Sequence, residues 1–124
     1  MSSRGRTTIH ISIPTSIGRR AGTVQIERNS ITFGRFSGSG PRQATRDVPM
    51  DVPVSTATAI LTGFNVQFSS NDGDHHLGNL DVRLDAALLD STNVRVTATF
   101  GLRDWSGTWD DRYEGQIFFS VVGE

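Results

Sequence analysis

The second half of this sequence alternates apolar and polar residues with a period of two. In Leu80–Asp85 the apolar residues fall on one face and the charged residues on the other, and Val94–Leu102 repeats the alternation. Thr56–Ser69 alternates as well, and Gly63 interrupts it in the manner of a β-bulge or a close backbone approach. A period of two is typical of half-buried β-strands, so these three segments are predicted strands.

Gly115–Val122 is the last predicted strand, and it is apolar on both faces. Ile117 and Phe119 fall on one face, and Phe118 and Val122 fall on the other. A strand with two apolar faces is expected in the middle of a sheet, or with its outer face against another subunit.

The first half of the sequence predicts shorter strands and more loop. Thr7–Ile13 alternates three isoleucines with polar residues, and Pro14 ends it. Thr23–Arg28 and Ser30–Phe33 are predicted to be two short strands separated by one asparagine. Gly34–Pro53 is dense in Gly, Ser and Arg, which predicts a long loop that holds at most one short edge strand.

Together these segments predict an all-β fold, a single antiparallel β-sandwich of about 6–8 short strands. Residues 1–6 are polar and basic, so we expect them to form a flexible arm outside a single domain of residues 7–124. The expected core consists of inward-facing apolar residues of the strands: Ile60, Phe64, Val66, Phe68, Leu80, Val82, Leu84, Val94, Val96, Phe100, Ile117, Phe119 and Val121.

The composition argues against several classes of protein. There is no cysteine, which leaves no disulfide framework and no thiol chemistry. No apolar run approaches the length of about 18 residues that a membrane-spanning helix needs, and the first residues lack the apolar segment of a secretory signal. We therefore predict no membrane span, and either a cytoplasmic protein or one exported without a conventional signal.

All twelve basic residues are arginines, and they are concentrated towards the amino terminus. Residues 1–46 hold eight arginines against Glu27 alone, a net charge of +7, whereas residues 47–124 have a net charge of −8. The pI near 6.3 excludes a uniformly basic nucleic-acid binder, and few aromatic residues lie among the arginines. A nucleic-acid partner is therefore not expected.

The separation of charge supports one of two functional hypotheses, a structural protein that assembles into a particle or filament. The Arg-rich amino-terminal arm of one copy would lie on the acidic loops of the next copy. Pro14 and the segment Thr15–Gly22 would act as a hinge, so we expect Thr7–Ile13 to pair with a neighbouring copy. A homo-oligomer is expected under both hypotheses.

Acidic residues gather in two predicted loops, 71–76 and 104–111, and the first also contains His75 and His76. Carboxylates suit Ca²⁺, and adjacent imidazoles suit Zn²⁺ or Ni²⁺. Alternatively, the first loop is an ordinary Asp/Gly turn, and the second pairs its carboxylates with nearby arginines. Calcium is the candidate cofactor, and its candidate ligands are Asp72, Asp74, Asp110 and Asp111.

Every Trp and Tyr of the chain lies within residues 105–113. Aromatic side chains in exposed loops serve as sugar platforms and interface anchors, because they offer a large area at a low entropic cost. Alternatively, this loop folds back and closes one end of the sandwich. The candidate ligand-binding residues are Trp105, Trp109, Tyr113, Asp104 and Asn71.

No catalytic motif stands out in the sequence. It lacks a cysteine nucleophile, a G-x-S-x-G elbow and an H-E-x-x-H zinc motif. Ten aspartates allow many carboxylate pairs, so a glycosidase pair has no specific support. We therefore predict a binding or structural protein rather than an enzyme.

The order of features in residues 54–124 resembles the H-type lectins. The similar segments are LTGFNVQF, LDVRLDAALLDSTNVRVTA, the aromatic and acidic DWSGTWDD, and the last strand GQIFFSVVG. The resemblance implies a small six-stranded β-sandwich that trimerises and binds galactose-type sugars. The last strand of that family usually carries a Trp and an Ala, where this chain has Phe119 and Val121. The leading hypothesis is therefore a homo-oligomeric, lectin-like module that binds a glycan.

Overall fold

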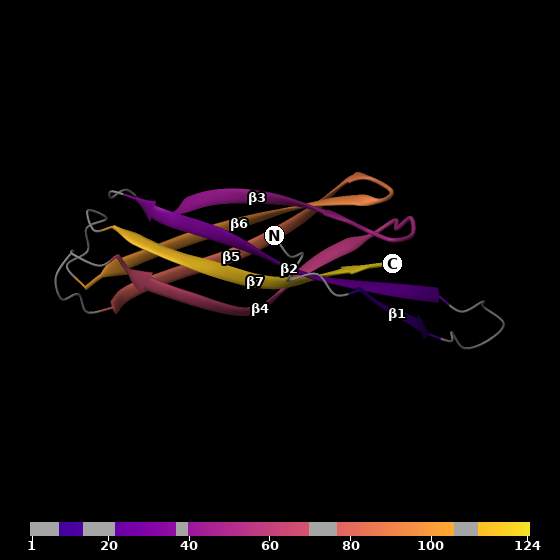
Figure 1. The fold of residues 1–124 in the computed structure, drawn as a ribbon, viewed down its shortest axis with the longest axis horizontal. Coiled ribbons are helices and arrows are strands. Elements are labelled where there is room, and N and C mark those ends of the chain that lie inside the picture. Colours follow the sequence, from indigo (N-terminus) through magenta and orange to yellow (C-terminus); the bar gives the residue numbers. More distant parts are fainter. Residues whose placement is uncertain (1–7, 14–21, 37–39, 70–76, 106–111) are drawn as a thin grey trace, which may run out of the picture.

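The structure is a computed structural model that describes residues 8–13, 22–36, 40–69, 77–105 and 112–124. This part of the chain contains seven strands and no helix, and all strand pairings are antiparallel (Figure 1). The predicted all-β antiparallel fold is therefore confirmed. The strands are β1 (Thr8–Ile13), β2 (Gly22–Phe36), β3 (Arg42–Pro49), β4 (Ala57–Phe68), β5 (Leu77–Asp90), β6 (Asn93–Asp104) and β7 (Tyr113–Gly123).

The strands form two sheets that pack face to face. Sheet A has the order β1-β2-β7-β4, and sheet B has the order β3-β6-β5. Strand β2 contacts β3 and strand β4 contacts β5, so the core fills the space between the sheets. The predicted central position of the last strand is confirmed, because β7 lies between β2 and β4. Fully buried core residues of β6 and β7 include Val94, Val96, Ala98, Phe100, Ile117, Phe119 and Val121.

A bulge in β4 changes which of its residues face the core. The register of β4 against β7 shifts between Leu61 and Gly63, as the glycine predicted. Ile60 therefore pairs with Ser120 on the outer face of sheet A and is 50% exposed, so its predicted core position is wrong. After the bulge, Phe64 pairs with the buried Ile117, yet it remains 47% exposed because β4 is the edge strand of its sheet.

Strand β2 is one continuous strand of 15 residues, so the prediction of two short strands is wrong. Asn29 pairs with Phe119 of β7 inside an unbroken run of the ladder, which becomes irregular only between Phe33 and Phe36. Pairing with the central strand outweighs the low intrinsic preference of asparagine for strands.

The predicted long loop Gly34–Pro53 contains the complete strand β3. It pairs with β6 from Arg42 opposite Phe100 to Pro49 opposite Asn93, and Val48 is fully buried. The short edge strand that the sequence allowed is therefore present, and it forms one edge of sheet B.

Strand β1 belongs to sheet A of its own chain. Its six residues pair with the first part of β2, from Thr8 opposite Glu27 to Ile13 opposite Gly22 (Figure 1). In this conformation the strand is paired internally, and exchange with a neighbouring copy stays a prediction. The predicted arm, residues 1–6, and most of the predicted hinge lie outside the described residues.

The hairpin between β5 and β6 depends on Asp90. Its carboxylate accepts hydrogen bonds from the Thr92 backbone amide at 2.9 Å and from the Asn93 side-chain amide at 3.0 Å. The Thr92 amide first, and the Asn93 side chain second, hold the pKa of Asp90 below its ordinary value of 3.8. An aspartate that bonds to the backbone just after it is a common device in tight turns.

The lowered pKa predicts a pH-dependent effect of Asp90→Asn. A carboxylate with a lowered folded-state pKa stabilises the fold above its unfolded pKa, and this contribution is lost as the pH falls through the folded pKa. We expect the variant to unfold at lower urea concentration than the wild type at pH 7, and the difference to shrink below a pH of about 3.8. Asp85→Asn, at an exposed position of the same strand, is the control. A difference that stays constant down to pH 2 would contradict the assignment.

Candidate functional site

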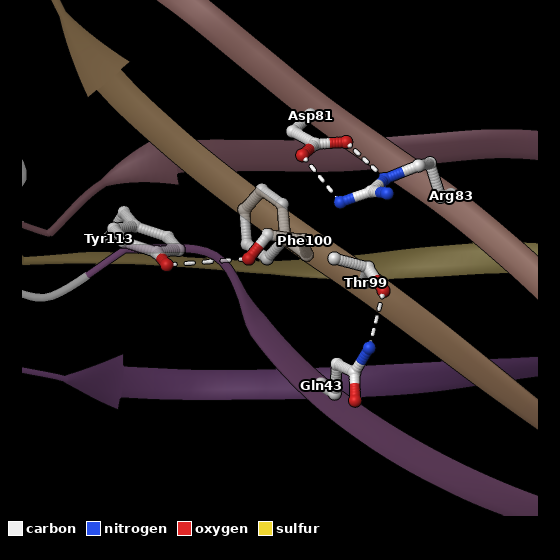
Figure 2. Close-up of polar contacts among 6 residues, drawn as sticks. All are labelled: Gln43, Asp81, Arg83, Thr99, Phe100 and Tyr113. Atoms are coloured by element: carbon white, nitrogen blue, oxygen red, sulfur yellow. Dashed lines mark hydrogen bonds and ion pairs between the residues drawn. The ribbon is translucent and has the colours of Figure 1, made fainter.

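Tyr113, a predicted ligand-binding residue, lies in the core. It has no exposed surface, and its hydroxyl lies 3.0 Å from the Gly40 carbonyl and 3.3 Å from the Phe100 carbonyl, to which it can donate. Its ring meets the Phe100 ring edge-on at 5.1 Å between centroids, and Figure 2 shows the hydroxyl directed at the Phe100 backbone. The Tyr113 ring is therefore closed off inside the sandwich and offers no surface to a sugar.

Arg42 covers the same end of the core. Its guanidinium lies 4.5 Å from the centre of the Tyr113 ring and 5.7 Å from that of Phe33, within the range of cation–π contacts. It also donates hydrogen bonds to the carbonyls of Gly34 and Tyr113. Arg42 therefore binds three strands together, and this part of the positive charge serves the fold itself.

Three more arginines make contacts within the chain. Arg46 of β3 donates to the Ser30 carbonyl of β2 at 3.2 Å. On the outer face of sheet B, Arg95 forms two hydrogen bonds with Asp47, at 2.8 and 3.1 Å, and this hydrogen-bonded partner lowers the pKa of Asp47. Figure 2 shows another part of the same face, where Gln43 donates to Thr99 and Arg83 pairs with Asp81. Both of these ion pairs lie within residues 47–124, whereas Arg42 and Arg46 of the basic segment bond to backbone carbonyls.

The other predicted ligand-binding residues divide into two groups. Trp105 directly follows β6 and is 75% exposed, and Asp104 is the half-buried last residue of that strand. Trp109 and Asn71 lie outside the described residues, as do the predicted calcium ligands Asp72, Asp74, Asp110 and Asp111. Within the described ranges, no group of three or more His, Asp or Glu residues could hold a metal ion.

The structure shows a polar hollow that the sequence reading missed. It is an open depression of about 240 Å³ on sheet A, formed where β2, β7 and β4 lie side by side. Thr32, Gln116 and Asn65 lie in one cross-strand row, because Gln116 pairs with each of the other two. Glu114 and Gln67 form the adjacent pair. We call this site the amide hollow, and its polar lining residues are Thr32, Asn65, Gln67, Glu114 and Gln116.

Hydrogen bonds orient two of the lining side chains. The Gln116 amide nitrogen donates to the Ser30 hydroxyl at 3.0 Å, which fixes the amide group. The buried Ser69 hydroxyl donates to a Glu114 carboxylate oxygen at 2.8 Å. Asn65 and Gln67 make no side-chain hydrogen bond to any other described residue. The hollow therefore presents both fixed and adaptable polar groups.

An aromatic ring lies beside the amide hollow. Phe118 is the next outward-facing residue of β7 after Gln116, and it is 37% exposed. It pairs with Gly63 of β4, and a Cβ atom at Gly63 would lie 3.9 Å from the ring. Because Gly63 has no side chain to cover it, the Phe118 ring stays exposed on the outer face of sheet A, next to the row of Thr32, Gln116 and Asn65.

Sequence reasoning could not locate this hollow, because its residues come from three strands far apart in the chain. Asn, Gln and Thr are ordinary residues for a solvent-exposed strand face, so their alternation with apolar residues indicates only a strand. The sequence does contain one signal, two polar residues on either side of a non-polar one in both NVQ (65–67) and EGQ (114–116). These four polar residues lie together only because the register pairs Asn65 with Gln116 and Gln67 with Glu114.

Comparison with known proteins gives no relative for this chain: no protein family, no curated protein and no solved structure matches it. Phe119 and Val121, at the positions where the lectin resemblance places a Trp and an Ala, are both fully buried. The described part of the chain contains no helix long and apolar enough to cross a membrane. The class that the structure establishes is an all-β antiparallel sandwich.

Proposed function

We propose that this protein is a non-catalytic glycan-binding module that binds its ligand in the amide hollow. The observation that supports this proposal is the row of Thr32, Gln116 and Asn65 across three strands, with Glu114 and Phe118 beside it. Three adjacent strands span about 10 Å. That length suits one or two sugar rings lying across the sheet.

The chemistry of the lining groups suits a neutral polyol. A sugar hydroxyl is both a donor and an acceptor, and a carboxamide offers an acceptor oxygen and two donor hydrogens to match it. The Glu114 carboxylate accepts from a hydroxyl, and a charged acceptor makes the stronger hydrogen bonds. The apolar face of a sugar ring can pack on the exposed Phe118 ring.

The same lining favours binding over hydrolysis. Glycoside hydrolysis needs a pair of carboxyl groups on either side of the scissile bond. Of the residues described around the hollow, Glu114 alone carries a carboxylate. An open depression also leaves a ligand in contact with water, so we expect weak binding at each site.

Trp105 is close in sequence to one residue of the hollow. It directly follows β6, and Glu114 is the second residue of β7, the next strand. The exposed Trp105 is therefore a second aromatic candidate for ligand contact. Calcium held by the acidic loops would add a separate, metal-dependent contribution.

A glycan array with the wild type, three site variants and one control variant tests the proposal. We expect Gln116→Ala and Asn65→Ala to lower the affinity for the glycans that bind by about tenfold each, because each removes hydrogen bonds worth about 1 kcal/mol or more. Trp105→Ala should weaken binding if the loop contributes to the site. Gln43→Ala, an exposed glutamine on sheet B, is the matched control and should bind as the wild type does.

The array is measured with calcium and with a chelator. Binding that survives the chelator is expected for the amide hollow, whereas binding that needs calcium would move the site to the acidic loops. The absence of binding at high protein concentration, or unchanged binding by Gln116→Ala and Asn65→Ala, would contradict the proposal.

A further inference from the structure

Strand β4 forms an edge of sheet A that neither charge, nor proline, nor short length protects, and its bulge at Gly63 is the one feature that interrupts it. It pairs only with β7 among the described strands, so the backbone groups of its other side point away from the sheet. Its twelve residues, ATAILTGFNVQF, include no charged residue and no proline. Natural proteins normally protect an edge with charges, proline or a short strand, because a bare edge pairs with other strands.

The edge strands of sheet B are protected in this way. Strand β5 carries Asp81, Arg83, Asp85 and Asp90, and β3 carries Arg42, Arg46 and Asp47 and ends at Pro49. These charges would have to lose water if either strand paired with another chain. The two edges of sheet B are therefore poor docking surfaces. The other edge of sheet A, β1, is also free of acidic and basic residues apart from one histidine, but it has six residues against the twelve of β4, so β4 offers the longer edge.

Exposed apolar side chains concentrate near the middle of β4. Leu61 is 41% exposed, Phe64 is 47% exposed, and Ile60 on the opposite face is 50% exposed. They flank the bulge and lie on both faces of the sheet. A strand that paired along this edge would cover apolar surface on both of its faces as well as the open backbone groups.

From these features we infer that a second copy of this chain docks on β4, with the two β4 strands antiparallel across a two-fold axis. An uncharged strand meets its own copy without like-charge repulsion, and the net charge of the whole chain is only −1. Two-fold dimers are the commonest closed assemblies, and their interface uses one surface of each copy. Sheet A would then continue through both copies.

This dimer does not depend on the proposed glycan site, but it would affect its use. Asn65 and Gln67 lie on β4, so the two amide hollows would lie on one continuous sheet surface near the axis. Two weak sites held together bind a multivalent ligand far more tightly than one site does.

Sedimentation velocity of the full chain over a concentration series tests the inference. We expect a reversible dimer, and we expect Leu61→Lys and Thr62→Lys to raise its dissociation constant by at least about tenfold, because lysine on an edge strand opposes strand pairing. Ala87→Lys, at an exposed position of the edge strand β5, adds the same charge to sheet B and should leave the dimer unchanged. Circular dichroism spectra and thermal melts confirm that each variant is folded.

Hydrogen exchange measured at high and low protein concentration gives a second readout that does not rely on variants. Backbone amides of β4 should be protected in the concentrated sample and should exchange faster on dilution, whereas β5 amides should not change. A monomer at all concentrations, a trimer or larger ring, or a dimer that Ala87→Lys breaks and Leu61→Lys does not would overturn the inference. Glycan binding by the monomeric variants is scored separately, so either proposal can fail alone.

Discussion

Val121→Asp is expected to leave the chain unfolded. Val121 is fully buried in the central strand of sheet A, and its neighbours in the register are Ala59 on one side and the buried Glu27 on the other. An aspartate there would place a second carboxylate next to the first in the interior. Burying a charge without a partner costs several kcal/mol, which is comparable with the whole stability of a domain, about 5–15 kcal/mol.

The effect of Val121→Asp is measured by far-UV circular dichroism and thermal melting. Thr58→Asp is the control, because Thr58 lies on the neighbouring strand with its side chain exposed on the outer face of the same sheet. We expect the control to melt within a few degrees of the wild type. A cooperative melt of Val121→Asp close to that of the wild type would contradict the position of this residue in the core.

Gln25→Met is expected to be the next most damaging substitution. Gln25 is 1% exposed, and its side-chain oxygen accepts from the backbone amides of Asp51 and Val52 at 2.9 and 3.1 Å. Its nitrogen donates to the Val52 carbonyl at 2.8 Å. The methionine side chain has a similar length but leaves these three backbone groups without their partner. Asp51 and Val52 are exposed, so water can reach the groups left behind, and at about 1 kcal/mol for each of the three hydrogen bonds the loss is roughly 3 kcal/mol.

Urea unfolding measures this loss, with the slope of the unfolding free energy against urea checked for two-state behaviour. Gln43→Met is the matched control, because Gln43 is exposed and donates one hydrogen bond, at 3.2 Å, to Thr99. We expect the control to change the unfolding free energy by less than about 0.5 kcal/mol. Equal effects of the two substitutions would show that the Gln25 bonds do not anchor the segment between β3 and β4.

Alternation along the chain was enough to predict the strands of the second half, but it could not fix the phase of every residue. The alternation at Leu80–Asp85 and Val94–Leu102 corresponds to β5 and β6, because neither segment contains an irregularity in that stretch. The sequence predicted a bulge at Gly63, but not its effect on the two parts of the strand. The extra residue places Ile60, before the bulge, on the outer face, whereas Phe64, after it, lies on the inner face. A bulge is visible in a sequence as a glycine, whereas its effect on the register depends on the partner strand.

The first half was predicted less well, because its strands depend on partners far along the chain. The ladder through Asn29 exists because β7 supplies Phe119 opposite it. Strand β3 contains three charged residues and a proline, which look like loop composition, but it forms an edge that solvent can reach. The β2–β7 and β3–β6 pairings cannot be predicted from residues 22–49 alone.

The functional predictions show the same limit. Sequence proximity grouped Tyr113 with the tryptophans, although the start of β7 places its ring in the core and Trp105 outside it. The amide hollow, in contrast, joins residues 32, 65 and 116, which lie 33 and 51 positions apart along the chain. Residues of one loop can be grouped by reading the chain, whereas residues of one sheet face require the strand order.

The strand order also determines when this protein can fold during its synthesis. Of the described strands β7 comes last along the chain, yet it lies between β2 and β4, which have no ladder with each other in the described part. While the ribosome is still adding residues 113–123, β4 has no partner in sheet A and the inner face of β6 lacks the strand that covers it. Sheet A is therefore completed only after these residues emerge. Until then, the uncharged β4 is exposed on both sides, and protection by a chaperone would matter most in that interval.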